Sequence, residues 1–214
     1  GGTVSLNAEE GIAATTAATT LNAVNQSTAG DIVVTEANDV TLGTVTNAFA
    51  TGAVTVTTTD GTITTGAVAV TASNGVITLT ANDASADNTT PEGITVGAGG
   101  ISSGGGAINL VAADDIALGG DVNATAGTVT ITADSGAQDT APDTDGAITR
   151  TLGTVTGGTV NLNATEGIAA FTAAGTLNAV NSTNTAGDIT ITEADDVTLG
   201  TVTNAFATGA VSLT

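Results

Sequence analysis

Apolar and polar residues alternate with a period of two in short stretches along the whole chain. Val54 and Val56 flank a threonine, and Ile108 and Leu110 flank an asparagine. This period is typical of a β-strand that buries one of its faces. Glycine recurs just before most of these stretches, and a Gly or Asp commonly precedes the next Ile or Val, which predicts tight turns between strands. No long segment has a 3.6-residue apolar period, so we expect an all-β chain.

The stretches are copies of one degenerate unit. The unit begins at Gly2, Gly30, Gly52, Gly66, Gly106, Gly127, Gly158, Gly187 and Gly209. Strands and glycine turns that recur at a period of about 20 to 30 residues indicate a solenoid. We therefore predict a parallel β-helix (β-solenoid) with rungs of about 20 to 30 residues. About eight to ten such rungs, spaced at about 4.8 Å, would form a rod 40 to 50 Å long.

A longer repeat contains the short one. Residues 1–14 return almost unchanged as residues 157–170, and residues 29–54 return as residues 186–211. We therefore expect residues 1–156 to be one long repeat, and residues 157–214 to be the start of the next in the same solenoid. Because the pattern runs through both ends, we expect the chain to be a segment of a longer polypeptide.

Two segments depart from the pattern, at residues 81–93 and 133–147. Both are rich in Asp and Asn, and each holds one of the two prolines, Pro91 and Pro142. Proline cannot donate a hydrogen bond to a strand ladder, so both segments are predicted to be loops that leave the rod. The run AATTAATT at residues 13–20 is predicted to be extended, because β-branched threonines weaken a helix.

The charge of the chain restricts its partners. The formal net charge is −20, there is no His or Cys, and Arg150 is the only cationic side chain. Nucleic acids and anionic membrane surfaces both require clustered cations, so we expect neither as a partner. The lack of cysteine excludes disulfides and thiolate chemistry. Such a negative charge favours solubility and keeps neighbouring rods apart.

The repeat unit resembles a known family. The pattern G-x-[VI]-x-[LVI]-x-A-x-x-[GD]-[IV], best seen in GDITITEADDVTLGTVT at residues 187–203, looks like the repeats of filamentous-haemagglutinin-type adhesins. The resemblance covers essentially the whole chain. It implies a right-handed parallel β-helix shaft, secreted from a bacterium, with roles in adhesion, biofilm and surface fibres. The Asn-Pro motifs of the family's secretion domain have no match here, since neither proline follows an asparagine.

Adjacent carboxylates are the first candidates for chemistry. Asp114–Asp115 and Asp195–Asp196 could be acid/base pairs, as in β-helical polysaccharide-degrading enzymes. Neighbouring residues on a strand point to opposite faces, however, and the first long repeat has Asn38 in place of Asp195. The position is better interpreted as a turn in which the side chain binds its own backbone. We therefore expect no catalytic site.

A calcium site is the second candidate. Asp139, Asp143 and Asp145 alternate in the 133–147 loop and precede Gly146. Carboxylate oxygens are ligands that Ca²⁺ prefers. The segment lacks the distal glutamate of an EF-hand loop and the glycine-rich nonapeptide of calcium-binding solenoids. A solvated turn is therefore the competing interpretation.

Threonines and phenylalanines supply two further candidates. The threonines of residues 54–65 could form flat rows, as in ice-binding solenoids, but the outward positions of the repeat vary in type. Threonine also simply fits outward strand positions. Phe49, Phe171 and Phe206 are expected to fill corners or the interior of the rod, with stacking on sugars as the alternative.

These observations lead to a structural expectation. We expect a secreted shaft segment of an extracellular filament or giant adhesin, with further copies of itself as the partner and no cofactor. The alternative is a calcium-assisted module that binds surface glycans through the 81–93 and 133–147 loops. A polysaccharide-degrading enzyme is the third possibility.

Overall fold

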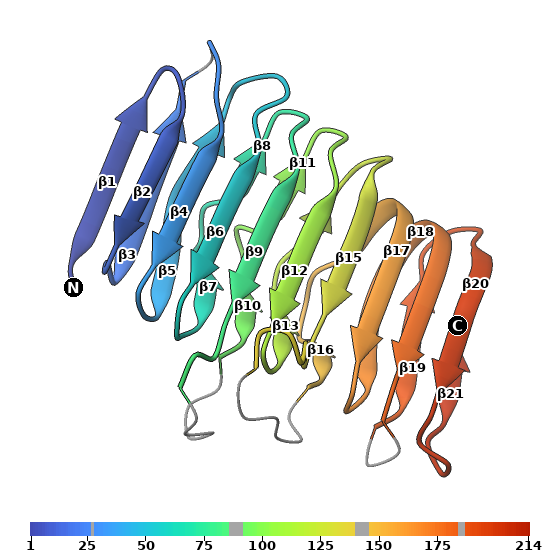
Figure 1. The fold of residues 1–214 in the computed structure, drawn as a ribbon. Coiled ribbons are helices and arrows are strands. Elements are labelled where there is room, and N and C mark those ends of the chain that lie inside the picture. Colours follow the sequence, from blue (N-terminus) through green and yellow to red (C-terminus); the bar gives the residue numbers. More distant parts are fainter. Residues whose placement is uncertain (27, 86–91, 140–145, 184–186) are drawn as a thin grey trace.

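The computed structural model describes residues 1–26, 28–85, 92–139, 146–183 and 187–214, and shows an all-β rod (Figure 1). All 21 strands belong to one sheet that winds around a long axis. The strands are β1 (Thr3–Ala8), β2 (Ile12–Thr16), β3 (Thr20–Asn25), β4 (Ile32–Glu36), β5 (Val40–Asn47), β6 (Val54–Thr58), β7 (Ile63–Thr65), β8 (Val70–Ala72), β9 (Ile77–Ala81), β10 (Ile94–Val96), β11 (Ile101–Ser103), β12 (Ile108–Ala112), β13 (Ile116–Leu118), β14 (Val122–Asn123), β15 (Thr128–Thr132), β16 (Ile148–Arg150), β17 (Val155–Ala164), β18 (Ile168–Asn181), β19 (Ile189–Glu193), β20 (Thr198–Asn204) and β21 (Val211–Leu213).

Every strand pair in the described residues is parallel, and each strand pairs with strands one rung before and after it, except β1, β2, β20 and β21 at the two ends of the rod, which pair on one side only. On one side of the rod β2, β4, β6, β9, β12 and β15 stack in register, followed by the second halves of β17 and β18 and by β20. We call this the nine-strand face. Figure 1 shows β4, β6, β9, β12 and β15 side by side along the rod. The predicted parallel β-helix is therefore confirmed.

The other side of each rung is bent. β1, β3 and β5 stack as continuous strands at the first rungs. β5 then pairs with two short strands, β7 and β8. From there each rung has two short strands on this side: β10 and β11 stack on β7 and β8, and β13 and β14 stack on β10 and β11. The nine-strand face is therefore the flatter side of the rod.

The rungs vary in length. Paired residues lie 17 positions apart between Val4 and Leu21, and 32 positions apart between Ile116 and Ile148. The longest rungs contain the segments at 81–93 and 133–147, whose described parts lie outside strands except for Ala81 and an isolated bridge. The rung length predicted from the repeat is thus close to the observed range, and the variation comes from the turns.

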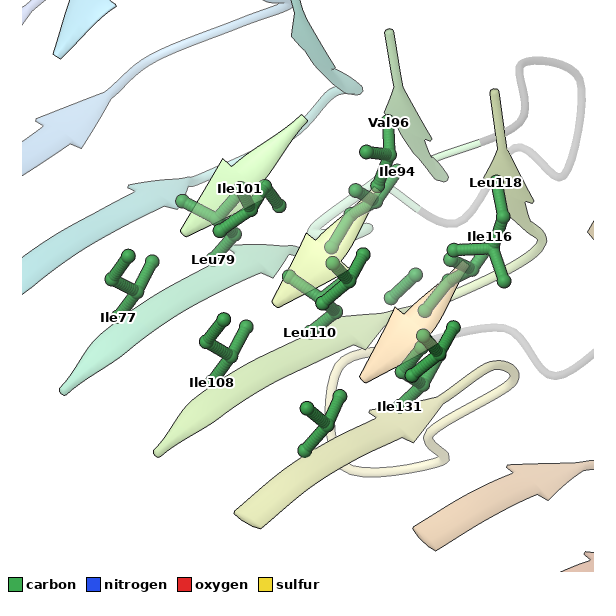
Figure 2. Close-up of a cluster of buried hydrophobic side chains, with 14 of the residues drawn as sticks. Ile77, Leu79, Ile94, Val96, Ile101, Ile108, Leu110, Ile116, Leu118 and Ile131 are labelled. Atoms are coloured by element: carbon green, nitrogen blue, oxygen red, sulfur yellow. The ribbon is translucent and has the colours of Figure 1, made fainter. Parts of the chain in front are cut away.

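The core is a set of aliphatic rows that run along the axis. Leu79, Leu110 and Ile131 are paired partners on successive rungs, and each is fully buried. Figure 2 shows these side chains and their neighbours from the other side of the rungs pointing into the same interior. The burial of one face of each alternating stretch is confirmed, since Val54, Val56 and Ile108 are also fully buried.

Glycine permits close approach of successive turns. Gly30 and Gly187 occupy equivalent positions in the two long repeats and have φ values of +86° and +92°. A Cβ atom at either residue would meet the carbonyl oxygen of Glu10 or Glu166 in the turn below. The left-handed backbone and the lack of space both require glycine there.

The two copies of the long repeat lie on different sides of the rod. β1 belongs to the bent side, but β17, whose residues 157–164 repeat residues 1–8, joins the nine-strand face. Conversely, β4 and β6 belong to the nine-strand face, whereas their copies β19 and β21 continue the bent side. Six steps along the stack of the bent side precede the second half of β17, which lies on the nine-strand face; the stack is β1, β3, β5, β7, β10, β13 and β16. One long repeat therefore holds about six and a half rungs.

Candidate functional site

Aspartates at the turns connect each rung to the next. In five places an aspartate that precedes an apolar strand residue accepts a hydrogen bond, at 2.7 to 2.8 Å, from a backbone N–H one rung further on. These pairs are Asp31 with Ala53, Asp39 with Thr62, Asp115 with Ala147, Asp121 with Thr154, and Asp188 with Ala210. For Asp39 and Asp115 we predicted a turn in which the side chain binds its own backbone. The turn is confirmed, but the N–H that each carboxylate binds belongs to the next rung and not to the local turn.

Asp114 and Asp115 each bind a backbone group of a neighbouring rung. Asp115 Oδ1 accepts from Ala147 N of the following rung at 2.7 Å, whereas Asp114 Oδ2 accepts from Glu92 N of the preceding rung at 2.5 Å. The two side chains thus bind backbone groups in opposite directions along the axis. Asp39 binds Thr62 N in the same way as Asp115 binds Ala147 N. These hydrogen bonds connect successive rungs of the stack.

The predicted calcium loop is described only in part. Asp139 lies in a short parallel bridge with Asp83, and Asp83 N donates to Gln138 O at 2.9 Å. Asp143 and Asp145 lie outside the described residues. Within the described ranges, no group of three or more acidic residues is placed to hold a metal ion. The bridge does show that the 81–93 and 133–147 segments meet on one edge of the rod, and calcium binding stays a prediction.

Asparagines form short buried ladders at equivalent points of the two long repeats. Asn25 Nδ2 donates to Asn47 Oδ1 at 3.0 Å, and Asn181 Nδ2 donates to Asn204 Oδ1 at 3.0 Å. Asn25 and Asn181 are fully buried. Asn25 Oδ1 also accepts from the N–H of Gly11. A buried amide requires such partners, so these ladders fix the register between neighbouring rungs.

A glutamate ends a strand at equivalent points of the two copies of the repeat, fully buried in the first and half-buried in the second. Glu36 is fully buried, and its carboxylate accepts from the hydroxyl of Thr16 and from Ala18 N at 2.7 Å. Its copy Glu193 accepts from Thr172 Oγ1 at 2.7 Å and from Ala174 N at 2.9 Å. The partners lie one rung earlier, so these carboxylates also connect rungs. Sequence reasoning missed this role, although the recurrence of TEAND and TEADD was visible.

The three aromatic residues lie outside the core. Phe49 and Phe206 are half-buried in the same NAFATG turn, where each N–H binds the Oδ1 of the asparagine two residues earlier, at 3.1 Å. Phe171 lies outside the core on β18, and the guanidinium of Arg150 lies 5.0 Å from its ring centroid. The expectation of corner positions is correct for the first two, while Phe171 is covered by the sole cationic side chain.

One outward position of the nine-strand face forms an aligned row in which six of the nine residues are threonines. Their register along the rod is Thr15, Thr35, Thr57, Thr80, Val111, Thr132, Asn163, Val180 and Thr203. We call this the threonine row, in which eight of the nine residues are β-branched. The sequence predicted that outward residues vary in type from unit to unit, and the row does include valine and asparagine. The strand register shows, however, that most of its residues are threonine. Because rung lengths differ, only the strand register reveals the row.

A second outward row lies beside the threonine row and is partly cross-linked. This second row contains Ala13, Val33, Thr55, Thr78, Asn109, Thr130, Asn161 and Asn178. Asn161 Nδ2 donates to Thr130 Oγ1 at 3.3 Å, and Asn178 Nδ2 donates to Asn161 Oδ1 at 2.9 Å. These bonds hold side chains of successive rungs in fixed orientations on the surface.

No charged side chain occupies either outward row of the nine-strand face, all of whose residues are described. The exposed acidic residues, such as Asp31, Asp39 and Asp115, instead lie in the turns at the ends of strands. The rod therefore combines strongly acidic turns with a flat, neutral face of threonine, asparagine and valine. The bent side also carries outward threonines in register, such as Thr41, Thr64 and Thr95, but its strands beyond β5 are divided into short pieces, whereas those of the nine-strand face are continuous.

Comparison with protein-family models, with curated proteins and with solved structures found no match for this chain. Among the residues that the structure describes, none belong to a helix of sufficient length and apolarity to cross a membrane.

Proposed function

We propose that this chain is a structural segment of a secreted extracellular fibre or giant adhesin, in which it acts as a rigid shaft. The single observation that carries the proposal is the repetition of one set of rung-to-rung contacts in both long repeats. The buried Asn25 ladder and the turn aspartate Asp31 have the same partners as their copies, Asn181 and Asp188. The conserved part of each repeat is therefore what holds rungs together.

The mechanics of such a shaft follow from the stack. Each rung contacts only its neighbours, so a solenoid can grow by adding rungs without changing those already present. The strands that end a stack are edge strands, and a further rung of the same kind can pair with them. We therefore propose that the partner of this segment is another copy of itself, joined end to end. A head-to-tail contact that does not close produces a filament.

Electron microscopy of the native, full-length material tests the proposal. About six and a half rungs at about 4.8 Å give an axial rise of about 31 Å for each long repeat. Uniform fibres whose mass per length corresponds to one long repeat per 31 Å would support a shaft. Short rods that end in a globular tip would contradict a fibre and would indicate an adhesin that uses this segment only as a stalk.

A calcium-assisted glycan-binding module is the second candidate. The observation that favours it is the bridge between Asp83 and Asp139, which brings the two acidic loops together on one edge. Calorimetric titration with calcium alone tests it, and Asp139→Asn is the matched variant. Binding that the variant loses would favour the module, whereas no heat at millimolar calcium would exclude it.

A further inference from the structure

We propose that the nine-strand face is a lateral docking surface for the same face of a second copy of this chain, so that two rods pair side by side. The proposal concerns the side of the rod and not its ends. It would hold whether or not the segments also join end to end into fibres.

Periodicity is the first reason to choose a second copy as the occupant. The threonine row repeats once per strand along nine paired strands, at the spacing of hydrogen-bonded strands, which is about 4.8 Å. A partner must match that spacing over the length of the face for the contact to extend. Another copy has the same spacing by construction. Two neutral sheets with matched rows can interdigitate their side chains when the sheets lie about 10 Å apart.

The area of the face is the second reason. Nine strands at about 4.8 Å and five residues at about 3.3 Å per residue describe a surface of about 40 by 16 Å, or about 650 Å². Stable specific interfaces bury about 800 Å² per partner. The face therefore approaches the size of a specific interface with no contribution from the turns. Beyond one row of threonines, it includes the exposed side chain of Val33, which such a contact would cover.

The order of the side chains is the third reason. Threonine and valine are β-branched and have few rotamers to lose on binding. Asn109 and Asn161 already donate hydrogen bonds to Thr78 and Thr130 of the preceding rung. Binding then immobilises few side chains that were free before, which lowers the entropic cost of association.

The distribution of charge sets the conditions for pairing. The net charge of −20 opposes association of two chains. The exposed acids lie in the turns, however, and not on the face itself. If the two sheets lie about 10 Å apart, their spacing exceeds the Debye length of about 8 Å at physiological ionic strength. Repulsion between the acidic turns of the two rods is then largely screened. Pairing should therefore be weak at low salt and stronger as salt screens the turns.

Sedimentation velocity of the full chain tests the proposal. The Debye length falls from about 30 Å at an ionic strength of 0.01 M to about 3 Å at 1 M. We expect monomers at the lower value and concentration-dependent dimers at the higher one. Electron microscopy of the same samples should show rods whose width has doubled and whose length has not, which distinguishes lateral pairing from end-to-end joining.

Three double variants locate the interface. Thr57→Asp with Thr132→Asp places like charges at the centre of the face, and we expect the dimer dissociation constant to rise more than about tenfold. Thr95→Asp with Thr149→Asp adds the same charge to outward threonines of β10 and β16 on the bent side, and should leave dimerisation unchanged. Thr57→Gln with Thr132→Gln is an uncharged second pair, whose longer side chains should also weaken pairing. Circular dichroism checks that each variant is folded.

Three outcomes would overturn the proposal. The folded chain could stay monomeric at both ionic strengths, or the dimer could respond to the bent-side variants and not to the face variants. The chain could instead stay monomeric and co-sediment with an insoluble neutral polysaccharide, or slow the recrystallisation of ice, through Thr57 and Thr132. In that case the face binds a different periodic surface and not a second copy. None of these results bears on the end-to-end shaft.

Discussion

Replacing Leu110 with alanine should produce one of the largest losses of stability that a single core substitution can cause in this rod. Leu110 lies in the middle of β12 and is fully buried between Leu79 and Ile131 of the neighbouring rungs. The substitution removes three carbon atoms, and at about 0.8 kcal/mol for each buried methylene the transfer term is about 2.4 kcal/mol. The rungs are hydrogen-bonded on both sides and can collapse only partly, so a cavity term raises the expected loss to about 3 to 4 kcal/mol.

The matched control is Val111→Ala on the same strand. Val111 points outward in the threonine row and is only partly buried. Its replacement changes strand propensity and little packing, so the expected loss is below about 1 kcal/mol. Urea unfolding followed by far-ultraviolet circular dichroism gives both values from the midpoint and slope of the transition.

Hydrogen exchange should accompany the urea experiment, because a rung contacts only its neighbours and unfolding of a solenoid need not be two-state. For Leu110→Ala, the faster exchange should centre on β9, β12 and β15. The reasoning would be refuted if the Leu110 and Val111 variants lost equal free energy, or if the Leu110 variant lost less than about 1 kcal/mol in both measurements.

Three further predictions concern the polar contacts between rungs and the single cation. Asp115→Asn should leave stability nearly unchanged, because an amide oxygen can still accept a hydrogen bond from the N–H of Ala147. Asp115→Ala should lower the unfolding free energy by about 1 kcal/mol. Equal losses for the two variants in urea unfolding would argue against the hydrogen bond. Asn181→Ala removes the amide donor to Asn204 Oδ1, which keeps only the N–H of Phe206, and it leaves the N–H of Gly167 without the oxygen that accepts from it. A loss of about 1 to 3 kcal/mol is therefore expected, and a neutral result would mean that the ladder does not fix register. Trypsin can cut only after Arg150, which donates to Gly153 O at 2.7 Å and covers Phe171, so the folded chain should resist cleavage, as followed on gels. Phe171→Thr, which introduces the residue found in the first copy, should speed cleavage. An unchanged rate would show that the ring does not hold the arginine.

The alternation of apolar residues was sufficient to predict the strands and their buried faces. Val54, Val56, Ile108 and Leu110 all point inward as the period of two requires. The stacking order was also accessible, because one unit cannot bury its apolar face alone and must lie against the next. These features depend on short-range patterns, which a sequence displays directly.

The contacts between rungs could not be predicted, because they join residues whose separation depends on turn lengths. Asp31 and Ala53 are 22 positions apart, but Asp121 and Thr154 are 33 apart. The same variation concealed the threonine row, in which Thr57 precedes Thr80 by 23 positions and Thr80 precedes Val111 by 31. The turn aspartates were recognisable by type, whereas their partners required the register.

Equivalent strands of the two long repeats lie on opposite sides of the rod, so equivalent turns lie on opposite edges. Phe49 lies in the turn between β5 and β6, and Phe206 lies in the same turn between β20 and β21, yet Figure 1 shows these turns on opposite edges of the rod. A fibre built from such repeats would therefore be two-sided, with each turn of the repeat facing alternately to either edge. Its structural period would be two long repeats, about 62 Å, although its mass period is about 31 Å. A receptor confined to one edge would meet only every second copy, whereas material on both edges could be cross-linked by a single fibre.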